Sequence, residues 1–127
     1  MSSIARVETS VKADKKRSLS QNKYRWGVVV ATVLKYMNEE LEREGSEYRA
    51  TPEDIDFHIK KMALKIAHII PTSLGDFVIQ GKLKTRNKRD FEEAMLQIRC
   101  YFDKRGIHIP EPNEVDIEEQ YKHNLDL

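Results

Sequence analysis

The strongest constraint on the fold is the spacing of apolar residues from Tyr24 to Leu41, which recur at steps of three and four residues. This spacing places them along one face of an α-helix. Ser18 or Ser20 can open the helix, and Gly45 is suited to its C-terminal end. We therefore expect one long helix that starts at one of these serines and ends just before Gly45.

A second helix is indicated by the run Thr51-Pro52-Glu53-Asp54. The threonine can cap the helix, proline suits the first helical position, and the two carboxylates favour the positive end of the helix dipole. The apolar stripe that follows continues to about Ile69, and Pro71 ends it.

A third helix is indicated by Asn87 with Asp90 three residues later, which is an N-terminal signature. Phe91, Met95, Ile98 and Phe102 then form a buried stripe, and Gly106 ends the helix.

Between the second and third helices the period changes. Residues 76–84 are short, apolar-rich and partly alternating, which predicts a strand, with His68 to Thr72 as its hairpin partner across Ser73-Leu74-Gly75. The fold class is therefore α+β and mostly helical, with about three to four helices and one short strand or hairpin element.

The chain divides into three parts. Residues 1–17 are an N-terminal arm or weak strand, residues 18–110 are a single domain, and residues 111–127 are an acidic tail with a short helix from about Val115. No stretch has the roughly 20 apolar residues of a membrane span, and no signal peptide is visible. The single cysteine, Cys100, excludes an internal disulfide and fits a reducing compartment. We expect a cytoplasmic protein, in the host cytoplasm if a phage encodes it, that has no contact with a membrane.

Charge is nearly balanced in total, at +1, but the signs are segregated along the chain. Residues 12–25 hold six basic residues and one acidic residue, and residues 82–89 hold five basic residues and none that is acidic. Two dense basic blocks on a near-neutral protein favour a local site for a polyanion, although a set of solvated faces would give the same composition.

The stretch from Lys15 to Trp26 combines basic residues, amides and aromatics at the start of a helix. Lysine, arginine and the backbone amides there suit phosphates, and Gln21 and Asn22 suit a base edge or a helix cap. Tyr24 could stack on an exposed base, whereas Trp26 falls on the apolar stripe and is expected in the core.

Catalytic and metal-binding patterns are nearly absent from the sequence. The four histidines are scattered and Cys100 has no partner at zinc spacing, so we expect no metal, no cofactor and no catalytic residue. Cys100 itself is expected to be a small buried hydrophobe. The exception is Asp76 followed by Gln80-Gly81-Lys82, which loosely matches a metal nuclease, but the spacing is short and glutamine is a poor ligand for Mg²⁺.

The segment Arg17-Ser18-Leu19-Ser20-Gln21-Asn22, followed by Trp26, resembles the R-S-L-x-Q-N-x-x-x-W opening of the phage NinB (Orf) recombination protein family. Residues 75–81 and the helix Phe91 to Arg105 with Gly106-Ile107 resemble the strand and the F-E-x-x-x-x-x-I helix of that family, so the resemblance covers roughly Arg17 to Glu114.

This resemblance implies a non-enzymatic recombination mediator of α+β fold. Such a protein forms a homodimer, binds single-stranded DNA and cooperates with single-strand-binding protein and a strand-annealing recombinase. The sequence departs from the family in its short N-terminal region and in the run from Lys82 to Arg86, which replaces a turn rich in serine and threonine.

We therefore expect a DNA-binding recombination accessory protein without enzymatic activity. Its expected DNA-binding residues are Lys15, Lys16, Arg17, Gln21, Asn22, Lys23, Tyr24, Arg25, Lys82, Lys84, Arg86, Lys88 and Arg89. Two alternatives stay open: a protein-interaction or regulatory module that does not bind DNA, and a metal-dependent nuclease that uses Asp76. The apolar stripe of residues 27–41 is long for a chain of this size to bury alone, which favours a homodimer as well.

Overall fold

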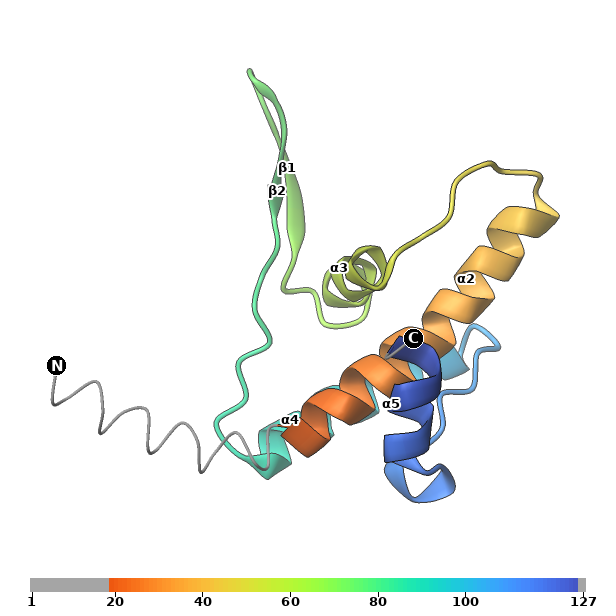
Figure 1. The fold of residues 1–127 in the computed structure, drawn as a ribbon. Helices are drawn as coiled ribbons and strands as arrows, with labels where there is room; N and C mark the ends of the chain where they lie inside the picture. The colour runs from red at the N-terminus through yellow and green to blue at the C-terminus, as the bar shows by residue number, and fades with distance from the viewer. Residues whose placement is uncertain (1–18, 126–127) are drawn as a thin grey trace, which may run out of the picture.

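The computed structural model describes residues 19–125 and confirms a mostly helical α+β fold with one antiparallel hairpin (Figure 1). Its elements in chain order are the π-helical segment η1 (Arg25–Val30), α2 (Ala31–Arg43), α3 (Pro52–Met62), β1 (His68–Thr72), β2 (Gly75–Ile79), α4 (Lys88–Asp103), the 3-10 turn η2 (Pro112–Glu114) and α5 (Ile117–Leu125). Residues 19–24 are helical and lead directly into η1, so residues 19–43 form one long helix. The expected long helix and the expected short helix in the tail are both confirmed, and the arm of residues 1–17 lies outside the described residues.

One cluster of buried side chains joins the long helix, α3 and α4. Its members lie at the helical spacing that the sequence shows, because each helix turns one apolar stripe toward the others. The long helix contributes Val28, Val29, Val30 and Val33, α3 contributes Ile55 and Ile59, and α4 contributes Phe91, Met95, Ile98 and Phe102. Trp26 packs against this cluster while partly buried, as expected.

The helix starts follow the capping signals in the sequence. The Thr51 side chain accepts a hydrogen bond from the backbone N–H of Asp54, and the Asp54 carboxylate accepts one from the N–H of Thr51. The Asn87 side chain caps α4 by accepting a hydrogen bond from the N–H of Asp90, and the Asp90 carboxylate accepts one from the N–H of Arg86. These contacts satisfy backbone donors that have no partner inside the helix.

The end of α3 differs from the expectation. The helix ends at Met62 instead of near Ile69, because the backbone turns at Lys65, whose φ is +57°. The apolar spacing continues through Ile66, so the stripe alone does not mark the end of the helix. The chain then enters β1, whose residues pair with β2 in the register Ile70↔Phe77, which confirms the hairpin.

The second strand is shorter than expected, since β2 ends at Ile79 and not at Lys84. Gly81 causes the change: its φ is +70°, and a Cβ there would overlap the carbonyl group of Ile66. Only glycine fits this close approach at the base of the hairpin. The hairpin itself extends away from the helices, and every residue of both strands is exposed (Figure 1).

Helix α5 packs across η1 at very short range. A Cβ on Gly27 would lie 2.8 Å from the Cα of Tyr121, so the absence of a side chain at position 27 allows the two backbones to approach. This contact, together with α3 and α4, buries the first part of the apolar stripe of residues 27–41 within one protein chain. This first part of the stripe is therefore not a surface that a second copy would need to cover.

Cys100 is exposed, so the prediction that it is buried was wrong. It lies on α4 two residues after Ile98 and two before Phe102, and two residues on a helix span about 200°. The position therefore turns away from the buried stripe.

Candidate nucleic-acid interface

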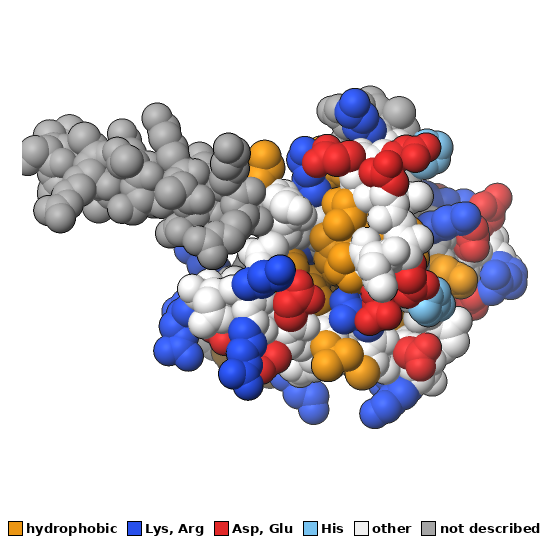
Figure 2. Space-filling model, turned by 90° about the horizontal axis from the view of Figure 1, so that it is seen from below, with side chains coloured by type: hydrophobic (Ala, Val, Ile, Leu, Met, Phe, Trp, Pro, Cys, Tyr) orange, Lys and Arg blue, Asp and Glu red, His pale blue; other side chains and the backbone are white. Residues whose placement is uncertain are grey.

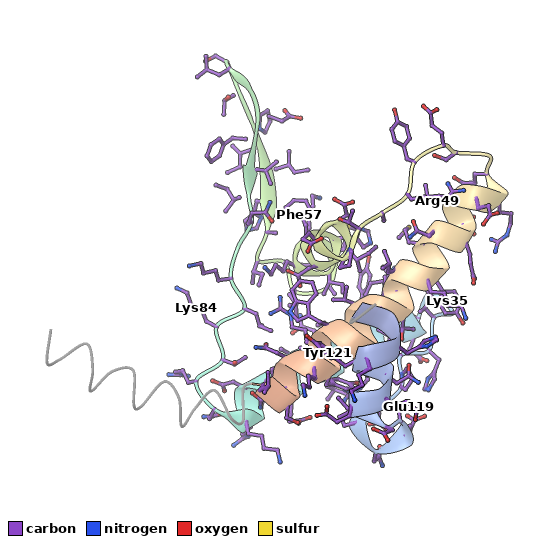
Figure 3. All side chains as sticks on the ribbon, in the orientation of Figure 1. Lys35, Arg49, Phe57, Lys84, Glu119 and Tyr121 are labelled. Carbon is purple, nitrogen blue, oxygen red and sulfur yellow. The ribbon has the colours of Figure 1, made fainter. Side chains whose placement is uncertain are left out.

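The segment of residues 81–87 connects β2 to α4 and carries the first three cations of the second basic block; we call it the connector. Burial alternates along it: Gly81, Leu83 and Thr85 are partly buried, whereas Lys82, Lys84 and Arg86 are exposed. Leu83 packs against the core, which fixes the segment to the body of the protein. Lys82, Lys84 and Arg86 all line one hollow of about 480 Å³, so the three cations share one surface. Figure 3 shows the Lys84 side chain directed away from the helices.

The first turn of α4 continues this surface. Lys88 and Arg89 are both exposed there, at the positive end of the helix dipole, where cations are slightly unfavourable for helix stability. Arg86 lies 3.5 Å from the carboxylate of Asp90 and Arg89 lies 3.3 Å from that of Glu93. With 91% and 86% of their side chains exposed, both arginines form only weak surface pairs and stay accessible to an anion.

The start of the long helix lies beside the start of α4. Gln21 and Lys88, which belong to the two different basic blocks, line one hollow of about 280 Å³. Asn22 is exposed next to it. The structure thus brings Gln21 of the first block beside Lys88 of the second. Lys15, Lys16 and Arg17 lie outside the described residues.

Viewed from below, several Lys and Arg side chains lie at the left of the body, where Figure 1 places the start of α4, with Asp and Glu side chains among them (Figure 2). Asp and Glu side chains also lie around α5, and further Lys and Arg side chains lie on that side of the body.

Tyr24 is a core residue, and the prediction that it stacks on a base was wrong. Only 2% of it is exposed. Its hydroxyl donates a hydrogen bond to the carbonyl of Pro110 at 2.7 Å and accepts one from Arg99 at 3.0 Å. Burial raises the pKa of this hydroxyl, although the hydrogen bond and the charge of Arg99 act in the opposite direction.

Arg25 is also held within the fold. Its guanidinium donates to one carboxylate oxygen of Asp56 at 2.6 Å, and the Lys60 ammonium lies 2.9 Å from the other oxygen. All three side chains are largely buried. Arg25 therefore neutralises a buried carboxylate and is not placed to meet a phosphate, contrary to the expectation from sequence.

Lys23 is paired less tightly. Its ammonium lies 2.8 Å and 2.9 Å from the two carboxylate oxygens of Glu118 on α5, and Glu118 is mostly exposed. The acidic tail thus covers one cation of the first basic block.

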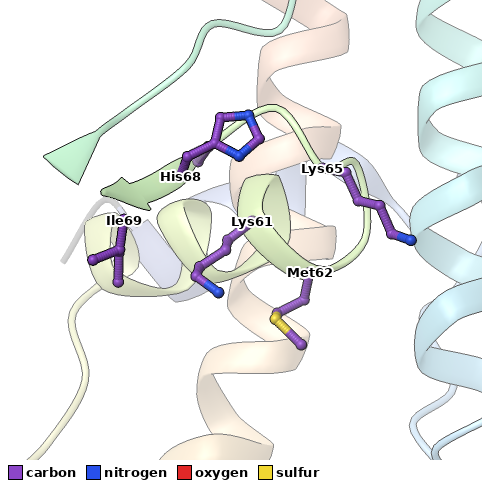
Figure 4. Close-up of a pocket in the computed structure, with 6 residues that line it drawn as sticks. Lys61, Met62, Lys65, His68 and Ile69 are labelled. Carbon is purple, nitrogen blue, oxygen red and sulfur yellow. The ribbon is translucent and has the colours of Figure 1, made fainter. Parts of the chain in front are cut away.

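Four further basic residues, which the sequence reasoning missed, extend the surface of the connector. Three adjoining hollows of about 370, 520 and 480 Å³ run from the end of α3 past the end of α4 to the connector. The first two share the lining residues Met62 and Lys65, and the last two share Gln97, so neighbouring hollows border one another. Figure 4 shows the first of them, with Lys61 and Lys65 at its wall. We call the three hollows together the basic furrow, and the basic residues that line it are Lys61, Lys65, Lys82, Lys84, Arg86, Lys104 and Arg105.

The basic furrow affects a neighbouring histidine. Burial lowers the pKa of His58 below its ordinary value, and the positive charges of Lys61 and Arg105 lower it further. Arg105 is itself fixed, since it lies 3.5 Å above the ring of Tyr101 and donates to the Tyr101 carbonyl. Lys61 lies in the last turn of α3 and Lys104 caps α4, positions where basic residues usually complement the helix dipole, so their spacing in sequence gives no signal of a shared site.

Comparisons of the chain with protein-family models, with curated proteins and with solved structures give no match. Within residues 19–125, no helix combines the length and the apolar character needed to cross a membrane. Over the same residues, no three His, Cys, Asp or Glu side chains are grouped so as to hold a metal ion.

Proposed function

We propose that the protein binds single-stranded DNA and acts as a non-enzymatic recombination mediator. The observation that carries this proposal is the connector, where Lys82, Lys84 and Arg86 are exposed and line one hollow, on a segment anchored by Leu83. Exposed cations in a row suit a chain of phosphates, which dominates affinity for nucleic acids. The cost of placing Lys88 and Arg89 at a helix N-terminus is also easier to understand if they serve binding and not stability.

The DNA-binding surface comprises the connector, the first turn of α4, and Gln21 and Asn22 at the start of the long helix. Lys15, Lys16 and Arg17 precede that helix start directly in sequence and add to it. The basic furrow offers the strand a path onward from the connector toward Lys104 and Arg105. Tyr24 and Arg25 are not part of this surface.

The resemblance to the phage NinB family supplies the biological setting of the proposal. It suggests a phage-encoded homodimer in the host cytoplasm that assists a recombinase on DNA coated with single-strand-binding protein. The fold class fits this setting, because the protein is a mostly helical α+β domain with a single hairpin.

The direct test is binding of a fluorescent single-stranded oligonucleotide over a series of salt concentrations. About five phosphate contacts would give a slope of log affinity against log salt of roughly −3 to −4, since each contributes about −0.7. The double substitution Lys84→Glu/Arg86→Glu should weaken binding by a similar factor on every sequence and flatten the slope by about 1.4.

The matched control is Lys35→Glu/Arg49→Glu, which makes the same change of charge at two exposed residues on the opposite side of the body (Figure 3). It should bind like the wild type. If the protein does not bind at low salt, or if the two double variants bind equally, the basic surface is only a solvated face.

A second candidate function, a protein-interaction module, is favoured by the apolar hairpin. Ile70, Phe77 and Leu74 are among the large hydrophobic residues exposed on it. A nuclease remains the third alternative and has a simple test, because Mg²⁺-dependent cleavage that disappears in Asp76→Ala would overturn the mediator proposal.

A further inference from the structure

Among residues 19–125, the hairpin is apolar on both of its faces and covered on neither. Side chains alternate between the faces of a strand, so the register assigns each residue to a face. Each face carries three exposed apolar residues, which are Ile69, Pro71 and Val78 on one and Ile70, Phe77 and Ile79 on the other. Such composition is typical of strands in the interior of a sheet, and a two-stranded hairpin alone is only marginally stable in water.

The two edges of the hairpin are not equivalent. In an antiparallel pair, opposite residues alternately exchange hydrogen bonds and point their backbone groups outward. Pro71 has no N–H and cannot exchange bonds with Asp76, so the pair Pro71↔Asp76 points outward, and so does Ile69↔Val78. The outer edge of β1 therefore lacks the donor at Pro71, whereas the edge of β2 keeps the N–H and C=O groups of both Asp76 and Val78.

We propose that two copies of the protein pair edge to edge through β2, so that their hairpins form one four-stranded antiparallel sheet. Because proline interrupts the outer edge of β1, only one edge of each hairpin is open. When two copies pair through this edge, neither has an open edge left for a third copy. The result is a closed two-fold dimer and not a fibre.

The sequence of β2 is complementary to itself in one register. With the two-fold axis at Phe77, the middle residue, all of β2 overlaps, and Asp76 of each copy exchanges hydrogen bonds with Val78 of the other. An axis at Asp76 would place two carboxylates directly opposite each other, which is unfavourable. An axis at Val78 would leave part of each strand unpaired.

This register also gives a role to Leu74, which is 98% exposed at the tip of the hairpin. In the antiparallel arrangement Leu74 of one copy lies opposite Gln80 of the other, at the base of the second hairpin. That base is held in place by the close approach of Gly81 to Ile66. The interface differs from the helical stripe of residues 27–41, whose first part is buried within one copy.

The experiment is to measure the mass of the full chain in solution by light scattering, without DNA. Wild type should be a dimer. Val78→Pro removes an outward N–H from the β2 edge and should give a monomer, whereas the matched Ile69→Pro removes an outward N–H from the β1 edge and should stay a dimer. The proposal would be overturned if the wild type were a monomer, or if the two proline variants had the same mass in solution. Binding of an unrelated peptide to a monomeric wild type would also overturn it, and would assign the β2 edge to a protein partner.

Cross-linking tests the register. In a Cys100→Ser background, Phe77→Cys should form an intermolecular disulfide under mild oxidation, because facing residues that do not exchange hydrogen bonds have Cα atoms about 4.5 Å apart. Val78→Cys should not, because the two copies of position 78 are offset by two residues and lie more than about 7 Å apart. The reverse result would contradict the Phe77-centred register. Neither test involves DNA, so their outcome is separate from that of the proposed DNA binding.

Discussion

Lys23 and Arg25, at the start of the long helix, are held by carboxylates of the fold, whereas Lys84 and Arg86, in the connector, are exposed. The two stretches have similar composition, yet one contributes mainly to the folded state and the other is free to contact a ligand. The difference arises from burial: a cation that packs beside the core needs a counter-charge, and a cation on an exposed segment does not. A basic run in a sequence thus predicts the sign of the charge on a surface, but it does not show which of the charged side chains can contact a ligand.

The largest effect should come from Tyr24, which belongs to the basic helix start in sequence and to the core in structure. Tyr24→Ala should lower the free energy of unfolding by about 3–5 kcal/mol, as is typical for removing a buried aromatic ring. Tyr24→Phe should cost about 1–2 kcal/mol, because the hydroxyl bonds to Pro110 and Arg99 are lost. Urea denaturation measures both values. A Tyr24→Ala variant of wild-type stability with weakened DNA binding would restore the stacking hypothesis.

A smaller loss of stability is expected for Arg25→Ala, of about 3 kcal/mol, which is at the low end for a broken buried pair because Lys60 still contacts Asp56. The matched variant is Arg86→Ala in the connector, which should change stability by less than about 0.5 kcal/mol. For DNA affinity the order should be reversed: Arg86→Ala should weaken binding more than Arg25→Ala does. Equal stability of the two variants would contradict the conclusion that the first basic stretch serves the fold and the second does not.

The fold was predictable where its signals are local. Asn87 and Asp90 are three residues apart, and the capping contact that they form was visible in the sequence. By contrast, the hydroxyl of Tyr24 is satisfied by Pro110, 86 residues away, and Lys23 by Glu118, 95 residues away. Such contacts leave no local pattern, so the assignment of Tyr24 and Arg25 to DNA could not be corrected before the structure was known.

The candidate site was predictable only in part for a related reason. The connector is basic in sequence and exposed in structure, but the basic furrow combines the ends of α3 and α4 with it. Lys65 and Lys104 lie at helix ends, where basic residues are common, and only packing places them along one path.

The smallest predicted effect is a pH dependence of stability, which arises from His58 beside the basic furrow. The pKa of His58 is lower in the folded protein than its value of about 6.5 in the unfolded chain, so the unfolded state binds more protons below pH 6.5. The contribution of His58 to the free energy of unfolding should therefore be fully present above about pH 6.5 and should decline as the pH falls below this value. Thermal denaturation between about pH 7.5 and 5.5 should show this decline, and His58→Gln should reduce it.

Bound DNA should raise the pKa of His58, because phosphates near Lys61 and Arg105 would offset the charges that lower it. NMR titration of the imidazole, with and without a single-stranded oligonucleotide, measures this change. An unchanged pKa at saturating DNA would show that the strand does not enter this part of the furrow.

The close contact between Gly27 and α5 has a consequence for how the chain folds during synthesis. Lys23 and Glu118 are 95 residues apart, and at about 5–20 residues per second the partner helix is made roughly 5–20 s after the long helix. During that interval α5 does not yet pack on the face of η1 around Gly27. Closing so long a loop also delays the contact relative to local helix formation, so the docking of α5 belongs to the late steps of folding.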